Sequence, residues 1–291
     1  MVNTPQSNGG PIAHRIQVGA QLRQLREARG LTRAEAGWAI RGSESKISRI
    51  ELGRVGFKER DVVDLLRLYG VEPGEEHSRL LAQVREANAP GWWQGYSDVL
   101  APWFQNYLDL EQAAELIRTY EVQFVPGLLQ TEAYARAVIN LGHGSRARDE
   151  IDRRVELRMA RATVLTRPEP PRLWAVLDEA VLRRPIGGAD ILRGQIEALL
   201  AATDLPNVRL QVIPFRAGGH PASGGAFSIL RFPHPDMSDV VYLEYLTSAL
   251  YLDKEEDVDL YAAAIGQLFI EAEPPQRTPD LLRAALRDLA R

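Results

Sequence analysis

Residues 31–54 read LTRAEAGWAIRGSESKISRIELGR. Thr32 is followed three positions later by Glu35, which forms a capping box: two side chains satisfy backbone N–H groups that a helix leaves free at its start. The pattern predicts a helix over residues 32–40. Arg41-Gly42 then predicts a tight turn.

A second helix follows that turn at once. Ser43 is a favoured N-cap residue, and the sequence predicts a helix from 44 to about 52, with Gly53 positioned to end it. Ile47 and Ile50 supply one apolar face, while the remaining positions are mostly polar. Two helices joined by a tight turn, the second with one buried and one polar face, are typical of a helix-turn-helix that enters the major groove of DNA.

Three more amphipathic helices flank this pair. Residues 15–29 place Val18, Leu22 and Leu25 on one helical face, with Gly30 as the expected C-cap. Two further helices are expected over residues 60–69 and 74–87. Five short helices predict a compact all-α domain over residues 15–88, preceded by a flexible tail over residues 1–14.

Two charged residues border the expected core of this domain. Arg26 lies next to Leu25 on the first helix, and Glu51 lies next to Ile50 on the third. Opposite charges at the edges of one small core are expected to meet, because each would otherwise lose its hydration alone. Gly37 is expected where the second and third helices approach closely.

The charge of the chain is unevenly distributed. Residues 1–60 contain 11 Lys and Arg against 5 Asp and Glu, whereas the whole chain has a net charge of −4. A basic segment on an acidic body is suited to local binding of phosphates.

Length and composition indicate an ordinary globular protein. The 291 residues suffice for two domains, and 45% of them are hydrophobic. There are no cysteines, which excludes disulfides and thiolate chemistry. No apolar run is long enough for a membrane span, and the first residues lack the pattern of a signal peptide. We therefore expect a cytoplasmic protein without membrane association.

Aromatic residues are concentrated over residues 89–110, which we interpret as a connector. They offer either a pocket or partner groove, or core packing between domains, and the sequence favours neither. The residues concerned are Trp92, Trp93, Tyr96, Trp103 and Tyr107.

Residues 111–291 mix helix and strand signals. The order of elements predicts an α+β domain with a mostly antiparallel sheet. Helices are expected over 131–141, 148–166, 189–202, 254–271 and 279–290, and strands near 120–124 and over 173–177, 208–214, 226–232 and 240–246.

No catalytic pattern is evident in this second part. The five histidines of the whole chain are scattered, with no tight metal-ligand spacing, and there is no nucleotide-binding motif. The Gly-rich run 218–225 contains His220 and Ser223, which could act as base and nucleophile, but a hairpin loop between two strands is the favoured interpretation. We expect no enzyme activity, no metal and no cofactor.

The N-terminal motif resembles the Xre/Cro/repressor family of helix-turn-helix domains. Departures from the family pattern are Ala36-Gly37 and Trp38. The resemblance implies that Glu44, Ser45 and Arg49 face base edges, with Arg49 suited to guanine. It also implies that Arg33 and Ser43 contact phosphates, that Lys46 reaches a base or a phosphate, and that Arg54 and Lys58 flank the backbone.

The second part resembles the C-terminal domain of the actinobacterial WhiJ-like group of such regulators, long filed as a domain of unknown function. The residues that carry the resemblance are Tyr107–Glu111, Val125–Thr131 with Tyr134–Arg136, Arg158–Arg161, Leu210–Pro214 and Gly224–Phe227. It implies no catalytic residues, and it implies action together with a small partner protein.

These observations predict a sequence-specific transcriptional regulator that binds double-stranded DNA as a homodimer. The second domain is expected to bind a small partner protein or to dimerise. One alternative is a small-molecule effector pocket in the second domain, and another is an enzyme with a DNA-binding appendage.

Overall fold

The computed structural model describes residues 11–53, 55–89, 91–143, 147–222, 224–233 and 237–290. The chain forms two compact units. The first comprises residues up to 94 together with 108–113 and 234–237, and the second comprises 95–107, 114–233 and 238–291.

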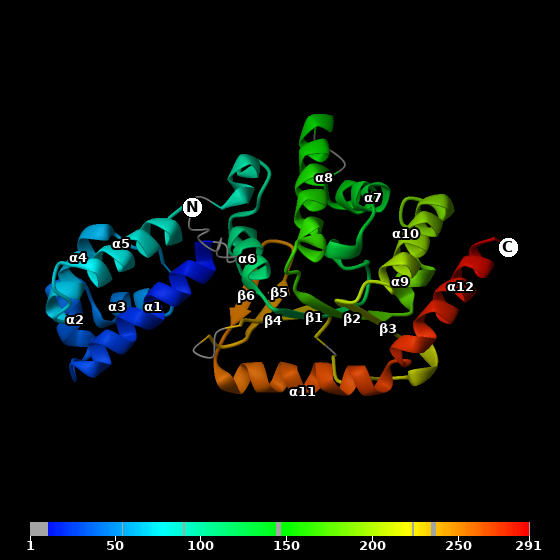
Figure 1. Ribbon diagram of the computed structural model, residues 1–291. Coiled ribbons are helices and arrows are strands. Elements are labelled where there is room, and N and C mark those ends of the chain that lie inside the picture. Colours follow the sequence, from blue (N-terminus) through cyan, green and yellow to red (C-terminus); the bar gives the residue numbers. More distant parts are fainter. Residues whose placement is uncertain are drawn as a thin grey trace. The chain divides into compact units, whose positions relative to one another are not determined.

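The first unit is helical, as the sequence predicts (Figure 1). The first helix begins at Pro11. Residues 11–14 are therefore helical, and their prediction as part of a flexible tail is wrong. Residues 1–10 lie outside the described part. Its helices are α1 (Pro11–Ala28), α2 (Arg33–Ala39), α3 (Glu44–Glu51), α4 (Glu59–Leu68) and α5 (Glu75–Ala87).

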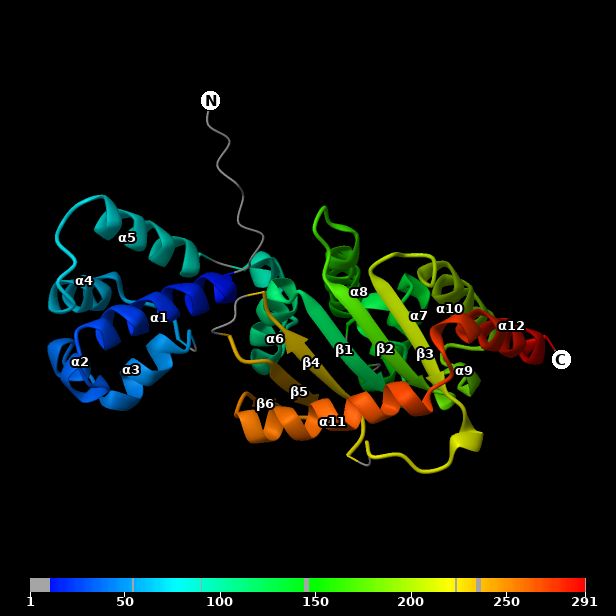
Figure 2. The same cartoon turned by 60° about the horizontal axis from the view of Figure 1, so that its bottom comes forward.

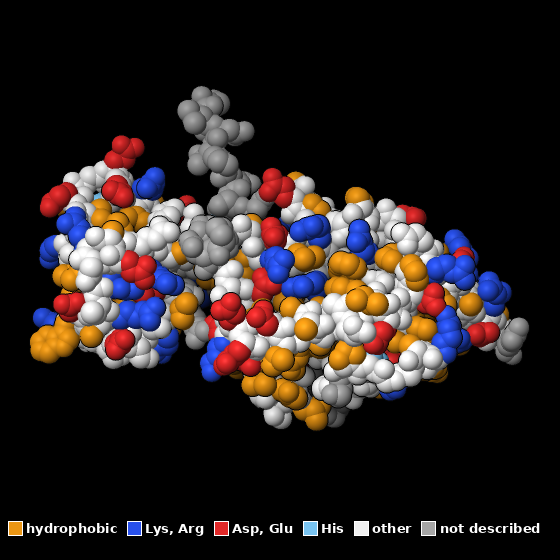
Figure 3. Space-filling view, turned by 90° about the horizontal axis from the view of Figure 1, so that it is seen from below, with side chains coloured by type: hydrophobic (Ala, Val, Ile, Leu, Met, Phe, Trp, Pro, Cys, Tyr) orange, Lys and Arg blue, Asp and Glu red, His pale blue; other side chains and the backbone are white. Residues whose placement is uncertain are grey.

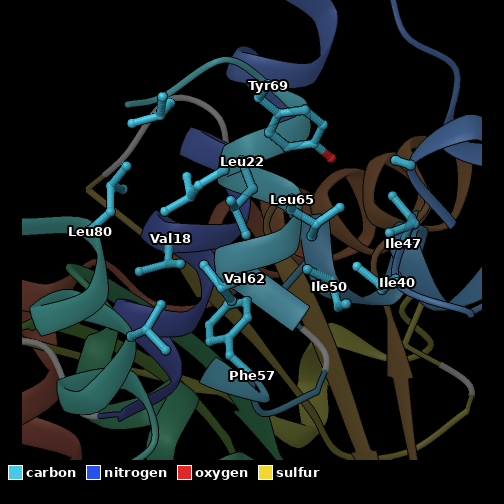
Figure 4. Close-up of a cluster of buried hydrophobic side chains, with 14 of the residues drawn as sticks. Val18, Leu22, Ile40, Ile47, Ile50, Phe57, Val62, Leu65, Tyr69 and Leu80 are labelled. Atoms are coloured by element: carbon cyan, nitrogen blue, oxygen red, sulfur yellow. The ribbon is translucent and has the colours of Figure 1, made fainter. Parts of the chain in front are cut away.

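One apolar cluster holds these five helices together. Leu22 of α1 and Ile47 of α3 are fully buried, and Leu66 of α4 and Val84 of α5 are buried with them. Figure 4 shows side chains from α1, α3 and α4 converging around Leu22 and Leu65. The predicted buried face of the third helix, Ile47 and Ile50, is confirmed.

Glycines allow two close approaches within this unit. A Cβ at Gly19 would lie 2.6 Å from the carbonyl oxygens of Ile50 and Glu51, so α1 and α3 are in contact at backbone level. A Cβ at Gly37 would lie 3.0 Å from the carbonyl carbon of Ser43, which confirms the predicted approach of α2 to the start of α3.

The second unit contains a six-stranded mixed sheet in the order β3-β2-β1-β4-β5-β6. β1 pairs with β2, and β2 with β3, in parallel, while the other three pairings are antiparallel. The prediction of an α+β fold with a mostly antiparallel sheet is therefore confirmed. The strands are β1 (Leu116–Glu121), β2 (Arg172–Asp178), β3 (Val208–Ile213), β4 (Phe227–Arg231), β5 (Val240–Glu244) and β6 (Ala249–Leu252).

Helices lie on both faces of this sheet (Figures 1 and 2). α7 (Glu132–His143), α8 (Arg148–Ala162) and α10 (Ala189–Ala202) lie on one side, and α11 (Glu255–Glu271) runs along the other. α12 (Thr278–Leu289) packs against α10. The helices that sequence periodicity did not predict are α6 (Pro102–Ala113) and the short α9 (Ala180–Arg183).

The loop after β3 differs from its prediction. The prediction of a hairpin loop between two strands over residues 218–225 is wrong. β3 lies at one edge of the sheet, and β2 and β1 separate it from β4. The loop is therefore a crossover connection that spans two strands.

The backbone contact at Gly19 yields a stability prediction. Gly19→Ala should lower the free energy of unfolding of the first unit by about 1–3 kcal/mol, because the added methyl group must push α3 away from α1. Thermal unfolding followed by circular dichroism measures the change. Gly194→Ala in α10 is the matched control: its Cβ meets no atom within 4 Å, so the better helix propensity of alanine should raise stability slightly. Equal melting of wild type and Gly19→Ala would contradict the packing described.

Candidate nucleic-acid interface

The α2–turn–α3 segment is fixed by local hydrogen bonds. The Thr32 hydroxyl accepts from the Glu35 N–H, and the Glu35 carboxylate accepts from the Thr32 N–H, so the predicted capping box is present. Arg41 adopts a positive φ of 52° in the turn. The Ser43 hydroxyl caps α3 by accepting from the Lys46 N–H at 3.2 Å. These bonds set the direction in which α3 leaves the turn.

The polar face of α3 is open to solvent. Glu44, Ser45 and Arg49 are exposed, while Ile47 and Ile50 face the core. The Arg49 Nε lies 3.4 Å from the Ser45 carbonyl oxygen, a long hydrogen bond that a stronger acceptor can replace. The helix therefore presents donors and acceptors of the kind that read base edges.

Lys46 has a partner that sequence reasoning missed. Its ammonium lies 2.6 Å from the carboxylate of Asp61, a buried residue in the first turn of α4. The Lys46 side chain keeps 30% of its surface exposed. A phosphate or base that binds this ammonium must therefore share it with Asp61.

The residues predicted to contact phosphate differ in their surroundings. The Arg33 Nε lies 3.1 Å from the Glu51 carboxylate, which holds this side chain beside the third helix. Lys58 is exposed and immediately precedes α4. Arg54 lies outside the described residues.

A cavity of about 710 Å³ is lined by the end of α2, by Lys46 of α3 and by α4 from its start to Leu68. Its charged lining is predominantly basic: Arg41, Lys46, Lys58, Arg60 and Arg67, against Asp61 and Asp64. Since free N–H groups at a helix start also attract anions, this hollow is electrostatically suited to a phosphate group. It lies next to the exposed face of α3.

The predicted ion pair between Arg26 and Glu51 is present. The Arg26 Nη2 lies 3.0 Å from Glu51 Oε2, and Nε lies 2.5 Å from Oε1, so the contact is bidentate. Both residues are buried. The hydrogen bond to Glu51 raises the pKa of Arg26, and Arg26 also donates to the carbonyl oxygen of Leu31. The pair thus joins α1, the loop before α2, and α3.

The predicted aromatic cluster is distributed over both units. In the first, the Trp93 indole N–H donates to the Asp109 carboxylate at 2.7 Å, and burial raises the pKa of Asp109. Trp92 is 37% exposed. In the second, Arg153 stacks over Tyr96, and the Trp103 carbonyl accepts from the Tyr251 hydroxyl.

Tyr107 is buried against other aromatic rings rather than open to a ligand. Its ring centroid lies 4.2 Å from that of Tyr242 and 5.3 Å from that of Phe104. The guanidinium of Arg161 lies over both Phe104 and Tyr107. This packing joins two of the segments that carry the C-terminal resemblance, because Tyr107 belongs to Tyr107–Glu111 and Arg161 to Arg158–Arg161.

The segment Val125–Thr131 also contacts α8, the helix that carries Arg158 and Arg161. The Arg158 guanidinium of α8 donates to the Gln130 side chain at 2.8 Å, and Gln130 donates to the carbonyl of Val125. Thr131 caps α7 through the Tyr134 N–H, as predicted. The run 125–131 is therefore held in place by α8 as well as by its own turn.

The Gly-rich loop offers one described polar side chain. The His220 Nε2 lies 2.9 Å from the hydroxyl of Tyr120, which is fully buried. Ser223, its suggested catalytic companion, lies outside the described residues. Among the residues described, no group of three or more His, Asp or Glu side chains is arranged to hold a metal ion.

Residues 17–80, which include α2 and α3, match a family model described as a helix-turn-helix domain. This match agrees with the fold of the first unit and with the exposed polar face of α3. Residues 104–284 match a second model, described as a domain of unknown function (DUF5753). This match covers more than half of the chain, so the protein belongs to the DUF5753 family. No curated protein and no solved structure matches the chain. In the part that the structure describes, every helix is too short or too polar to cross a membrane.

The buried ion pair yields a stability prediction for the interface. Glu51→Ala should cost about 3–5 kcal/mol, because it leaves the buried Arg26 guanidinium without its carboxylate. Replacing both residues, as Arg26→Met with Glu51→Leu, should cost much less. Chemical unfolding of the three proteins measures this difference. A double replacement that is as damaging as Glu51→Ala would show that the pair contributes stability beyond mutual neutralisation.

A half-buried carboxyl in the second unit yields a pH prediction. Burial raises the pKa of Glu121 to about 8, although Arg161 and Arg158 lower it. The folded state then binds a proton that the unfolded state releases near pH 4.3, so stability should fall as pH rises from about 4 to 8. Glu121→Gln should flatten this part of the pH profile, whereas Glu115→Gln, a change at an exposed residue, should not. Unfolding midpoints from pH 4 to 8 test this, and identical slopes for wild type and Glu121→Gln would refute it.

Proposed function

We propose that this protein is a sequence-specific, DNA-binding transcriptional regulator that reads the major groove through α3. The observation that carries the proposal is the exposed polar face of α3, held at a fixed angle by caps, a backbone contact to α1 and the Arg26–Glu51 pair. The resemblance to Xre-type and WhiJ-like regulators supports it. Since its target is DNA, we place the protein in the cytoplasm.

Selection from random double-stranded DNA with the full chain tests this proposal, because the operator sequence need not be known in advance. An enriched motif is expected. No enrichment, or equal binding to the motif and to shuffled DNA, would refute specific reading.

Arg49 is the residue we assign to base recognition. Arg49→Ala should cost about 1–3 kcal/mol at the selected motif and relax the preference at one base position. Fluorescence anisotropy with motif variants measures both effects. Arg79→Ala is the control, since Arg79 is exposed on α5 and has no assigned contact. Unchanged affinity of Arg49→Ala would mean that α3 docks differently.

Lys58 is assigned to the phosphate backbone, together with the basic hollow beside it. Lys58→Ala should weaken binding to all sequences alike and reduce the slope of log affinity against log salt by about 1. Titrations between 50 and 200 mM salt measure the slope. A loss confined to one base position would instead make Lys58 a reader of sequence.

For the second unit we propose assembly: dimerisation, binding of a small partner protein, or both. Two half-sites about one helical turn apart suit a helix-turn-helix dimer, because a single module contacts few base pairs. This role requires no reaction, and we assign the protein no catalytic function.

An effector pocket is the second candidate role of this unit. A cavity of about 470 Å³ lies between β3 and the end of α11, lined by the rings of Trp174 and Phe269 and by the Arg209 guanidinium. Its size and mixture of aromatic and charged groups fit a small ligand. Thermal shift of the full chain against anionic aromatic compounds would separate this role from assembly.

A further inference from the structure

Helix α11 is unusually apolar for a helix that covers a sheet. Residues 260–270 read LYAAAIGQLFI and contain no charged side chain. Its inward residues, Ile265 and Leu268, are fully buried against the sheet. A helix with one buried face normally presents charged residues on the other, and one that is apolar all round is usually covered on both sides. The outward face of α11 therefore resembles an interface.

The exposed positions confirm which face is uncovered. Leu260 is 71% exposed and Ile270 is 78% exposed, and Ala263 and Gln267 between them are exposed as well. Spacings of three and four residues place all four on one side of the helix. Hydrophobic side chains spread over this side of the molecule in Figure 3.

The adjoining edge of the sheet extends this apolar surface. Leu250 of β6 pairs with Leu243, whose side chain lies in the core under α11, so Leu250 is on the same face of the sheet. Leu250 is 46% exposed, and Leu246 in the preceding turn is fully exposed. Large apolar side chains exposed together on one side of a domain mark a binding site more often than a solvated face.

Charges at the two ends of α11 indicate the orientation of what covers it. The first turn is acidic, with Glu255, Glu256 and Asp257. The last turn of α11 has no basic residue and ends at Glu271. It borders the 470 Å³ cavity, where Ile270 and Pro274 lie beside the exposed Arg209 of β3. The Arg209 guanidinium lies over the Trp174 ring, 4.9 Å from its centroid.

We propose that α11 packs antiparallel against α11 of a second copy of this chain, around a two-fold axis that crosses the outward face of the helix at the level of Ile265. Leu260 of each copy then lies against Ile270 of the other, and Ala263 against Gln267, with the small Ala263 allowing close approach. The same register places Glu256 of each copy opposite Pro274, beside Arg209. A parallel pairing would instead bring the acidic first turns together.

This inference extends the proposed function, because it assigns the dimer of the regulator to a surface. A two-fold contact is isologous, so every interaction occurs twice and no surface remains for further growth. The two acidic first turns and the two Arg209 side chains favour the antiparallel orientation of the helices and add to the affinity of the dimer.

Sedimentation velocity of the full chain without DNA tests the interface. Wild type should be a dimer at about 10 µM, and Leu260→Asp with Ile270→Asp should be a monomer with unchanged melting. The matched control is Leu141→Asp on α7, where Leu141 is 67% exposed; it should remain a dimer. A monomeric wild type, or a double variant that dimerises as wild type does, would overturn the proposal.

Charge reversal tests the register. Arg209→Glu should weaken self-association by about tenfold, the effect of two lost rim ion pairs, and Glu256→Arg in the same chain should restore it. Failure of this restoration would rule out the antiparallel register.

Crosslinking gives a second, independent readout. The chain has no cysteines, so Gln267→Cys introduces a single thiol near the axis. A short bismaleimide should join two copies of this variant but not two copies of Leu141→Cys, and equal yields would overturn the proposal. Arg49→Ala should dimerise normally, so a failure of DNA binding is distinguishable from a failure of this interface.

Discussion

The helix-turn-helix unit depends on the hydrogen bonds that the buried Glu51 carboxylate accepts. This carboxylate lies at the end of α3 and accepts hydrogen bonds from Arg26 on α1 and Arg33 on α2. Three helices therefore share one buried anion. The nearby backbone contact at Gly19 admits no side chain, so α1 and α3 have little freedom to slide. Because α3 carries the exposed Arg49, the base reading that we propose for this residue would depend on the position of the buried Glu51 carboxylate.

Local sequence signals predicted most of this unit. The capping box at Thr32, the N-cap at Ser43 and the glycine after α1 each act within a few residues, and all three are present. The Arg26–Glu51 pair could also be predicted, because each residue borders an apolar stripe. The pairing of Lys46 with Asp61 could not, since Asp61 resembles any acidic residue in a first helical turn. Only the packing of α4 beside α3 brings the two together.

The second unit was predictable in composition but not in connectivity. Periodicity indicated most strands and helices, and α10 matches its prediction at both ends. Which strands pair is a long-range property, so β3 and β4, neighbours in sequence, are separated by two strands. The four-residue β6 is too short to give a pattern, and α6 is obscured by its aromatic residues, whose positions suggested a connector. Likewise, α11 was predicted as a helix, but its apolar outward face became evident only when the sheet showed which side is covered.

The pairing of Lys46 with Asp61 has a consequence for how the protein would search a genome. An ammonium already neutralised within the protein adds little to the general attraction for phosphates, so contacts at random sequences are shorter-lived. A site that offers a better-placed acceptor than Asp61 recovers the full charge of Lys46. In the proposed complex with DNA, the Asp61 carboxylate would compete with phosphates for Lys46, which would shorten the dwell time on wrong DNA while leaving the correct site able to displace it.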